Sequence, residues 1–186
     1  MKHAKDFQPD SYRDWKVLLI LFIISLIISL IPLLIQKSPG YMDGDYYYAI
    51  GLQLFEGKGF TEDFIWNFLD NPLEIPHPSN TYWMPLASII SFFGMKLFSS
   101  DSFIAARAVF LILASSIPPL TYILAQKITG KKRTSLFAAV LSLIPGYYFV
   151  YQVNTDTFTL YMLLGGLFLL LGFGNNPFLE RKKKKS

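Results

Sequence analysis

The chain contains no cysteine, and its 186 residues include only two histidines and 16% charged residues. The absence of cysteine excludes disulfide frameworks and thiolate metal sites. A charged fraction this low, combined with 52% hydrophobic residues, argues against a soluble domain. A hydrocarbon core about 30 Å thick is crossed by about 20 apolar residues in a helix. The composition therefore predicts an all-α integral membrane protein.

Four apolar segments are long enough to cross a bilayer as helices, namely 16–36, 103–125, 134–151 and 157–174. We interpret the first as a retained span, because it is longer than a signal-peptide core of about 7–15 residues and no small-residue cleavage pattern follows it. A fifth apolar run, from Pro85 to Phe98, is shorter and typical of an interfacial or re-entrant helix. The sequence thus predicts one transmembrane domain over 16–174.

Basic clusters precede the first span, separate the second from the third, and follow the fourth (Lys2, Lys5, Arg13 and Lys16; Lys127 and 131–133; 181–185). Four spans place all three clusters on one side, which the positive-inside rule makes cytoplasmic. The protein is then predicted to span the plasma (inner) membrane. Residues 1–15 and the basic tail 175–186 are cytoplasmic, and the loop 37–102 is extracytoplasmic. The basic ends suit contact with anionic lipid, and nothing in them favours nucleic acid.

The external loop 37–102 is acidic, with eight Asp and Glu residues against three lysines. Its many aromatic residues argue against a disordered linker. The spacing of Tyr48, Leu52 and Phe55 predicts a short helix over 45–55 that lies on the membrane. With the run 85–98, this gives the loop two juxtamembrane helices.

The first candidate for chemistry is the acidic and aromatic run 41–48 (YMDGDYYY), which directly follows the first span. Partial desolvation at a membrane surface would raise the pKa of Asp43 and suit it to act as a general base. It could also bind a divalent cation beside a phosphate, or form an ordinary turn with Gly44. Asp45 could share a metal or a proton with Asp43, or be a simple loop charge.

Three further polar residues lie near the same predicted membrane surface. Asp156, at the outer end of the fourth span, could join Asp43 or favour the helix N-terminus, with Asn154 or Thr155 as cap. Arg107, inside the second span, could pair with a carboxylate, grip a phosphate or extend to the lipid head groups. His77 could serve as a metal ligand or proton shuttle, or have neither role.

Aromatic residues are also frequent in the external loop (46–48, Tyr82 and Trp83). Such residues gather at membrane interfaces as an aromatic belt. They could equally stack on a sugar ring.

Several motifs together resemble a known arrangement. The runs 43–54 (DGDYYYAIGLQL) and 57–60 (GKGF) resemble the first external loop of GT-C fold glycosyltransferases, most closely the dolichyl-phosphate-mannose–protein mannosyltransferase-like group (glycosyltransferase family 39 and its bacterial relatives). Asp43 and Tyr47 fall on that group's acidic and aromatic positions. Three later runs resemble the entry to its juxtamembrane helix, the arginine-bearing start of its second span and the acidic start of a later span: 77–86 (HPSNTYWMPL), 103–107 (FIAAR) and 156–158 (DTF).

The resemblance implies an inverting enzyme that moves a sugar from a polyprenyl-phosphate carrier to a protein, lipid or glycan acceptor at the outer membrane face. Asp43 would be the catalytic base. Arg107, with a metal or His77, would balance charge on the carrier phosphate. The resemblance names no certain cofactor and leaves a divalent metal open. The residues it assigns to substrate binding are Asp45, Tyr47, His77, Trp83, Arg107 and Asp156.

Full members of this group have more spans than this chain. The resemblance therefore implies an N-terminal portion of such an enzyme, or a fold completed by a second chain. One alternative is a non-enzymatic membrane subunit or transporter fragment that handles lipid-linked sugars. That alternative predicts polar groups near the bilayer midplane, whereas the charged candidates here gather at the outer interface. Another alternative is an inactive remnant.

Overall fold

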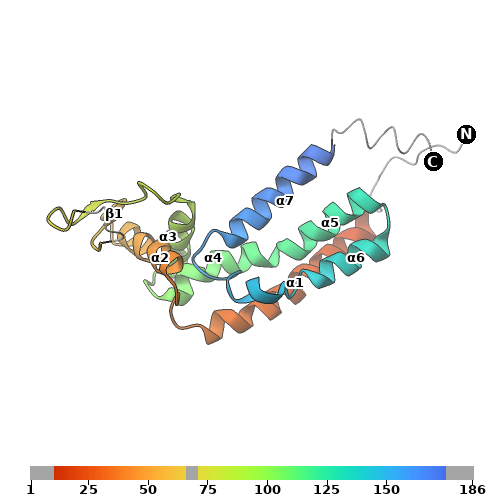
Figure 1. Cartoon of the computed structure of the whole chain (residues 1–186). Coiled ribbons are helices and arrows are strands. Elements are labelled where there is room, and N and C mark those ends of the chain that lie inside the picture. The colour runs from red at the N-terminus through yellow and green to blue at the C-terminus, as the bar shows by residue number, and fades with distance from the viewer. Residues whose placement is uncertain (1–10, 66–70, 175–186) are drawn as a thin grey trace, which may run out of the picture. The chain divides into compact units, whose positions relative to one another are not determined.

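The computed structural model describes residues 11–65 and 71–174, and most of these residues are helical. Figure 1 follows the chain from α1 (red) to α7 (blue). The elements are α1 (Ser11–Ile35), α2 (Met42–Phe55), β1 (Thr61–Glu62), β2 (His77–Pro78), α3 (Leu86–Phe98), α4 (Phe103–Ser115), α5 (Ile117–Thr129), α6 (Lys132–Leu141), the 3-10 helix η1 (Gly146–Val150) and α7 (Phe158–Gly174). β1 and β2 form a two-stranded antiparallel sheet in which Glu62 pairs with His77.

Within residues 11–65 and 71–174, two helical stretches are long and apolar enough to cross a membrane, Trp15–Ile35 in α1 and Phe103–Thr129 in α4 and α5. They coincide with the first two predicted spans, 16–36 and 103–125. The fourth, 157–174, is the shorter apolar helix α7.

The third predicted span, 134–151, is not one continuous helix, because α6 ends at Leu141 and only η1 follows. Pro145 explains the break. Proline has no backbone N–H to donate, and its ring disfavours helical geometry at the preceding residue. The next residue, Gly146, adopts a φ of 61°.

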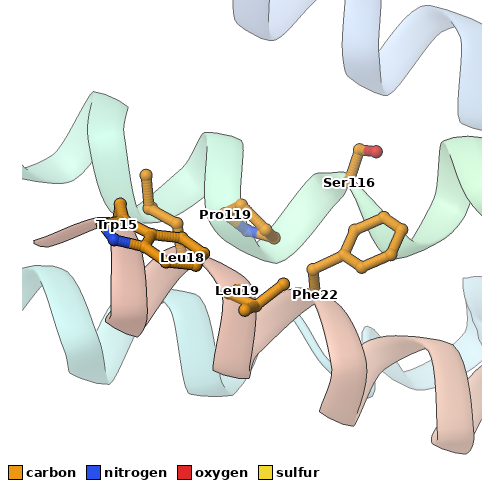
Figure 2. A pocket seen from close by; sticks show the side chains of 6 residues that line it. All are labelled: Trp15, Leu18, Leu19, Phe22, Ser116 and Pro119. Atoms are coloured by element: carbon orange, nitrogen blue, oxygen red, sulfur yellow. The ribbon is translucent and has the colours of Figure 1, made fainter.

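The described chain divides into two compact units. The first contains residues 11–28, 115–145 and 161–174, and the second contains 29–65, 71–114 and 146–160. In the first unit, Leu21 of α1, Tyr122 of α5 and Ala139 of α6 form a small buried cluster. An apolar groove of about 340 Å³ lies in this unit and is shown in Figure 2, lined by Trp15, Leu18, Leu19, Phe22, Ser116 and Pro119.

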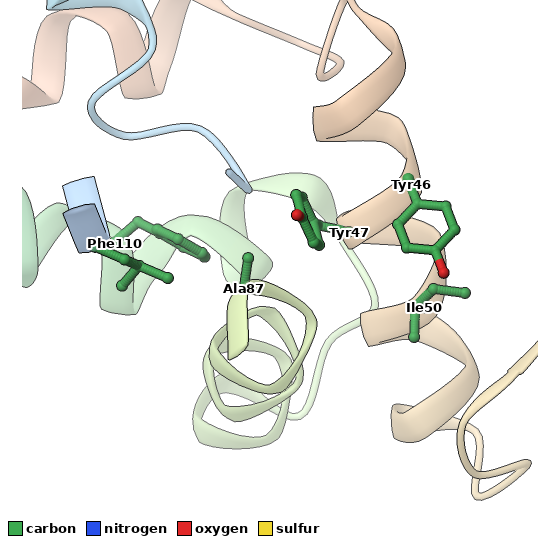
Figure 3. Close-up of a cluster of buried hydrophobic side chains, with 6 residues drawn as sticks. Tyr46, Tyr47, Ile50, Ala87 and Phe110 are labelled. Atoms are coloured by element: carbon green, nitrogen blue, oxygen red, sulfur yellow. The ribbon is translucent and has the colours of Figure 1, made fainter. Parts of the chain in front are cut away.

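The second unit holds the larger core. Its buried side chains come from α2, α3, α4 and the start of α7, and five of the six are labelled in Figure 3 (Tyr46, Tyr47, Ile50, Ala87, Phe110 and Leu160). The helix predicted over 45–55 is confirmed as α2, which begins three residues earlier. The run 85–98 is helical as α3 and turns its small residues inward, with Ala87, Ser91 and Gly94 all buried. This core fixes the position of α2, whose first turn carries Asp43 and Asp45.

Candidate functional site

The acidic run 41–48 does not form a turn but starts a helix. Gly40 has a φ of 77°, a left-handed conformation that glycine adopts without strain. Tyr41 is extended and α2 begins at Met42, so Asp43 and Asp45 lie in its first turn. Carboxylates are stabilised there by the positive end of the helix dipole. The Asp43–Gly44 pair is therefore part of a helix N-terminus.

A second segment, Gln152 to Asp156, packs against this helix start, and all five of its residues are buried. The Asn154 side-chain amide donates to the Pro39 carbonyl oxygen at 3.0 Å, and the Thr155 hydroxyl donates to the Gly44 carbonyl oxygen at 2.8 Å. Both side chains therefore bind the backbone on either side of Asp43. A β-carbon at Gly44 would lie 3.1 Å from the Pro39 β-carbon, so the packing here is close.

This packing brings Asp156 to the site that Asp43 occupies. Asp156 is 3% exposed. It accepts hydrogen bonds from the Tyr41 hydroxyl and from the backbone and side chain of Thr157. Asp43 is half-buried, and its pKa is raised by desolvation and then by the negative charge of Asp156. The pKa of Tyr41 is also raised, first by desolvation and then by its hydrogen bond to Asp156. The phenol therefore stays protonated and donates.

The remaining predicted site residues occupy different surroundings. Asp45 is exposed at the rim of a groove of about 340 Å³ and its pKa is raised by desolvation. Tyr47 is only 1% exposed and belongs to the core (Figure 3). The Trp83 ring lies 6.3 Å from the Tyr47 ring. His77 pairs with Glu62, Nδ1 to Oε1 at 3.2 Å.

Sequence reasoning did not single out Tyr41 individually, and it treated Asn154 and Thr155 only as helix caps. The available signal was the polar run 154–157 (NTDT) between two apolar segments. In the described part of the chain, no group of three or more His, Asp or Glu residues could hold a metal ion. A divalent metal stays a prediction.

Arg107 is fully buried, and its guanidinium binds the end of α1. Nη2 donates to the carbonyl oxygens of Leu33 and Gln36 at 2.7 and 2.9 Å, and Nη1 donates to the Gln36 side-chain oxygen at 3.1 Å. Nε donates to the Phe103 carbonyl oxygen at 3.3 Å. The last carbonyls of a helix lack intrahelical partners, so Arg107 caps α1 just before the short connection to α2, whose first turn carries Asp43. A phosphate contact for this residue stays a prediction.

Replacing Arg107 with methionine is expected to lower the free energy of unfolding by about 3 kcal/mol or more, because several acceptors would lose a charged donor. The midpoint of thermal unfolding should fall by roughly 6–12 °C. Arg107→Lys should restore little, since an ammonium cannot reproduce the planar fork of donors. The measurement is thermal unfolding in lipid nanodiscs. The exposed Arg133→Met variant is the control, and a midpoint for Arg107→Met equal to that control would contradict the capping role.

Comparison with known proteins identifies no relative: no protein-family model matches the chain, and neither a curated protein nor a solved structure matches it.

Proposed function

We propose that this chain is a membrane glycosyltransferase of the GT-C kind, or the part of one that holds the acidic site. It moves a sugar from a polyprenyl-phosphate carrier to a protein, lipid or glycan acceptor. One observation carries the proposal: the half-buried Asp43 and the buried Asp156 come from distant parts of the sequence and meet at the start of α2, a short loop after the apolar helix α1. A base with a raised pKa works closer to neutral pH.

The proposal includes four membrane crossings. α1 and the stretch formed by α4 and α5 supply two. The third crossing is formed by α6 together with η1. The fourth is α7, whose 17 residues extend about 26 Å. With the basic clusters in the cytoplasm, the start of α2 lies at the extracytoplasmic surface, where a lipid carrier presents its phosphate and sugar.

The chemistry proposed for the site is a single displacement. The acceptor hydroxyl oxygen attacks the anomeric carbon as its proton passes to the Asp43 carboxylate. The bond from that carbon to the phosphate oxygen breaks, and its electron pair leaves with the polyprenyl phosphate. The sugar is transferred with inversion. Asp156, held by Tyr41 and Thr157, contributes negative charge that raises the pKa of Asp43.

A transfer assay tests the proposal. The chain is placed in lipid nanodiscs with polyprenyl-phosphate hexoses labelled in the sugar, and source-cell membrane extract supplies acceptors and any second chain that completes the site. Label should move to an acceptor, with release of polyprenyl phosphate, and the Asp43→Asn variant serves as the blank. Binding of the carrier without turnover would instead favour a non-enzymatic subunit. If the chain neither binds the carrier nor transfers the sugar, the enzyme and the non-enzymatic subunit are both rejected.

Asp156→Asn is expected to shift the acid limb of the pH–activity profile to lower pH. Asp43 acts as a base only when ionised, so activity falls as pH drops through its raised pKa. Removing the neighbouring negative charge lowers that pKa, and the limb moves with it whatever happens to the maximal rate. Asp63→Asn removes an equal charge from an exposed position in the loop 37–102, which also contains Asp43, and it should leave the acid limb in place. An unmoved limb in Asp156→Asn would show that the two carboxylates are not coupled.

A further inference from the structure

A row of tyrosine rings leads from the surface of the second unit to the carboxylate pair. The Tyr147 ring in η1 lies 5.3 Å from the Tyr151 ring, and their hydroxyl oxygens are 3.1 Å apart. The Tyr151 ring in turn meets the Tyr41 ring edge-on at 5.2 Å. The Tyr41 hydroxyl donates to Asp156. We call Tyr147, Tyr151 and Tyr41 the tyrosine row.

A second pair of rings widens the row. Tyr148, the neighbour of Tyr147 in η1, lies 5.6 Å from the ring of Phe158, and Phe158 lies 5.5 Å from Tyr151. These contacts join the five rings into one continuous group. Aromatic pairs of this kind are common in protein cores. Here two of the rings lie at the surface, because Tyr147 is 77% exposed and Tyr148 is 46% exposed.

An exposed aromatic surface beside a carboxylate suits a pyranose ring, because the sugar has both C–H groups and hydroxyl groups to bind. The C–H groups on one face of a sugar carry partial positive charge and pack on the electron-rich face of an aromatic ring. Its hydroxyl groups need an acceptor, which the half-buried Asp43 carboxylate provides, while the buried Asp156 is already bound by Tyr41 and Thr157. Ligand sites commonly combine aromatic walls with a few convergent polar groups in this way.

We infer that the tyrosine row is a pyranose-binding subsite, in which a hexose stacks on Tyr147 and Tyr151 and directs its hydroxyls towards the half-buried Asp43. This inference rests on the proposed function, and it names the part of the substrate that the site would bind. The same chemistry would serve the sugar of the carrier or a terminal sugar of a glycan acceptor. An aromatic belt at the membrane surface is the outcome that would replace it.

The test is saturation-transfer NMR with methyl α-mannopyranoside, methyl β-glucopyranoside and methyl β-galactopyranoside as probes. The chain is held in lipid nanodiscs so that no sugar-based detergent competes. Saturation from the aromatic protons should reach the C–H protons of one ring face of at least one probe. Tyr147→Leu should weaken that binding about threefold to tenfold, the loss of one aromatic contact.

Tyr161→Leu is the matched control, because Tyr161 of α7 is 68% exposed and lies outside both the tyrosine row and the aromatic residues of the loop 37–102. It should leave probe binding unchanged. No saturation with any probe, or equal binding in both variants, would overturn the inference and leave the tyrosines as interface anchors only. In the transfer assay, a raised KM of Tyr147→Leu for the carrier alone would assign the row to the donor sugar, and a raised KM for the acceptor alone to the acceptor.

The two proposals fail separately. Pyranoside binding needs no turnover, so it is measured on the unchanged chain independently of the transfer assay. Binding at the tyrosine row without sugar transfer would reject the enzyme and keep the subsite. Transfer by a chain in which Tyr147→Leu changes neither probe binding nor KM would keep the enzyme and reject the subsite.

Discussion

Asp43→Asn is expected to lower the rate of sugar transfer by about 10²–10⁴-fold, the usual loss when a general base is removed. Asparagine has nearly the shape of aspartate but cannot accept the proton of the acceptor hydroxyl. The reduction should appear in kcat as well as in kcat/KM, because the interaction is made only in the transition state. Initial rates over a range of carrier concentrations measure it.

The same substitution is expected to leave thermal stability unchanged or raised. The pKa of Asp43 is raised above its ordinary value of 3.8 in the folded chain, so the folded state binds this proton more tightly than the unfolded state. That stabilisation is present at low pH and is lost as pH rises through the folded-state pKa. At neutral pH the ionised carboxylate is therefore a cost to folding, and the neutral amide removes it. A loss of activity without a loss of stability identifies a functional residue.

Asp63→Asn provides the comparison for both measurements, since it removes one negative charge from an exposed position in the same loop. It should keep activity and stability near the values of the unchanged chain. Transfer by Asp43→Asn at the rate of Asp63→Asn would rule out the base role. A large fall in the unfolding midpoint of Asp43→Asn would show that its main role is structural.

Local patterns in the sequence predicted the helices but not what holds the site together. The apolar spacing in 45–55 and the apolar run 85–98 were sufficient to predict α2 and α3 as helices. The residues that set the spacing in α2, Tyr48, Leu52 and Phe55, are only partly buried, and its buried face includes Tyr47 and Ile50 instead. The proximity of Asp156 to Asp43 depends on tertiary packing, which the sequence can only suggest through a shared membrane surface. The hydrogen bonds of Asn154 and Thr155 to the backbone around Asp43 have no periodic signal at all.

Arg107 and Tyr47 illustrate how one residue type suits two roles. A buried arginine within an apolar helix is expected to bind an anion, yet the free carbonyls at the end of α1 accept the same donors. A tyrosine beside acidic residues suits substrate contact, yet Tyr47 faces the core because it lies one helical turn before Ile50 and Gly51, which are also buried. Sequence spacing predicts a helix here, and only the fold decides which of its faces is buried.

A large loss of stability, comparable to that of Arg107→Met, is expected from Gly94→Ala in α3. A β-carbon there would lie 2.8 Å from the carbonyl oxygen of Ala106 and closer still to that of Ala105, both in α4. These are backbone atoms, which cannot turn aside as a flexible side chain could, so α3 and α4 must separate. Overpacking costs about 1–3 kcal/mol and occasionally more. We expect about 3 kcal/mol or more, and a thermal midpoint roughly 6–12 °C lower.

Gly165→Ala in α7 makes the same chemical change where nothing lies within 4 Å of the added carbon. Alanine favours the helix over glycine by about 0.5–1 kcal/mol, so this variant should unfold at the same or a slightly higher temperature. The two variants therefore move the midpoint in opposite directions, and the difference isolates the contact between α3 and α4. Since α2 packs on α3 through Gly51 and Ser91, separation of α3 from α4 disturbs the helix that carries Asp43. Gly94→Ala should then lower stability and sugar transfer together, whereas Asp43→Asn lowers transfer alone. A Gly94→Ala chain as stable as Gly165→Ala would mean that α3 and α4 do not approach this closely.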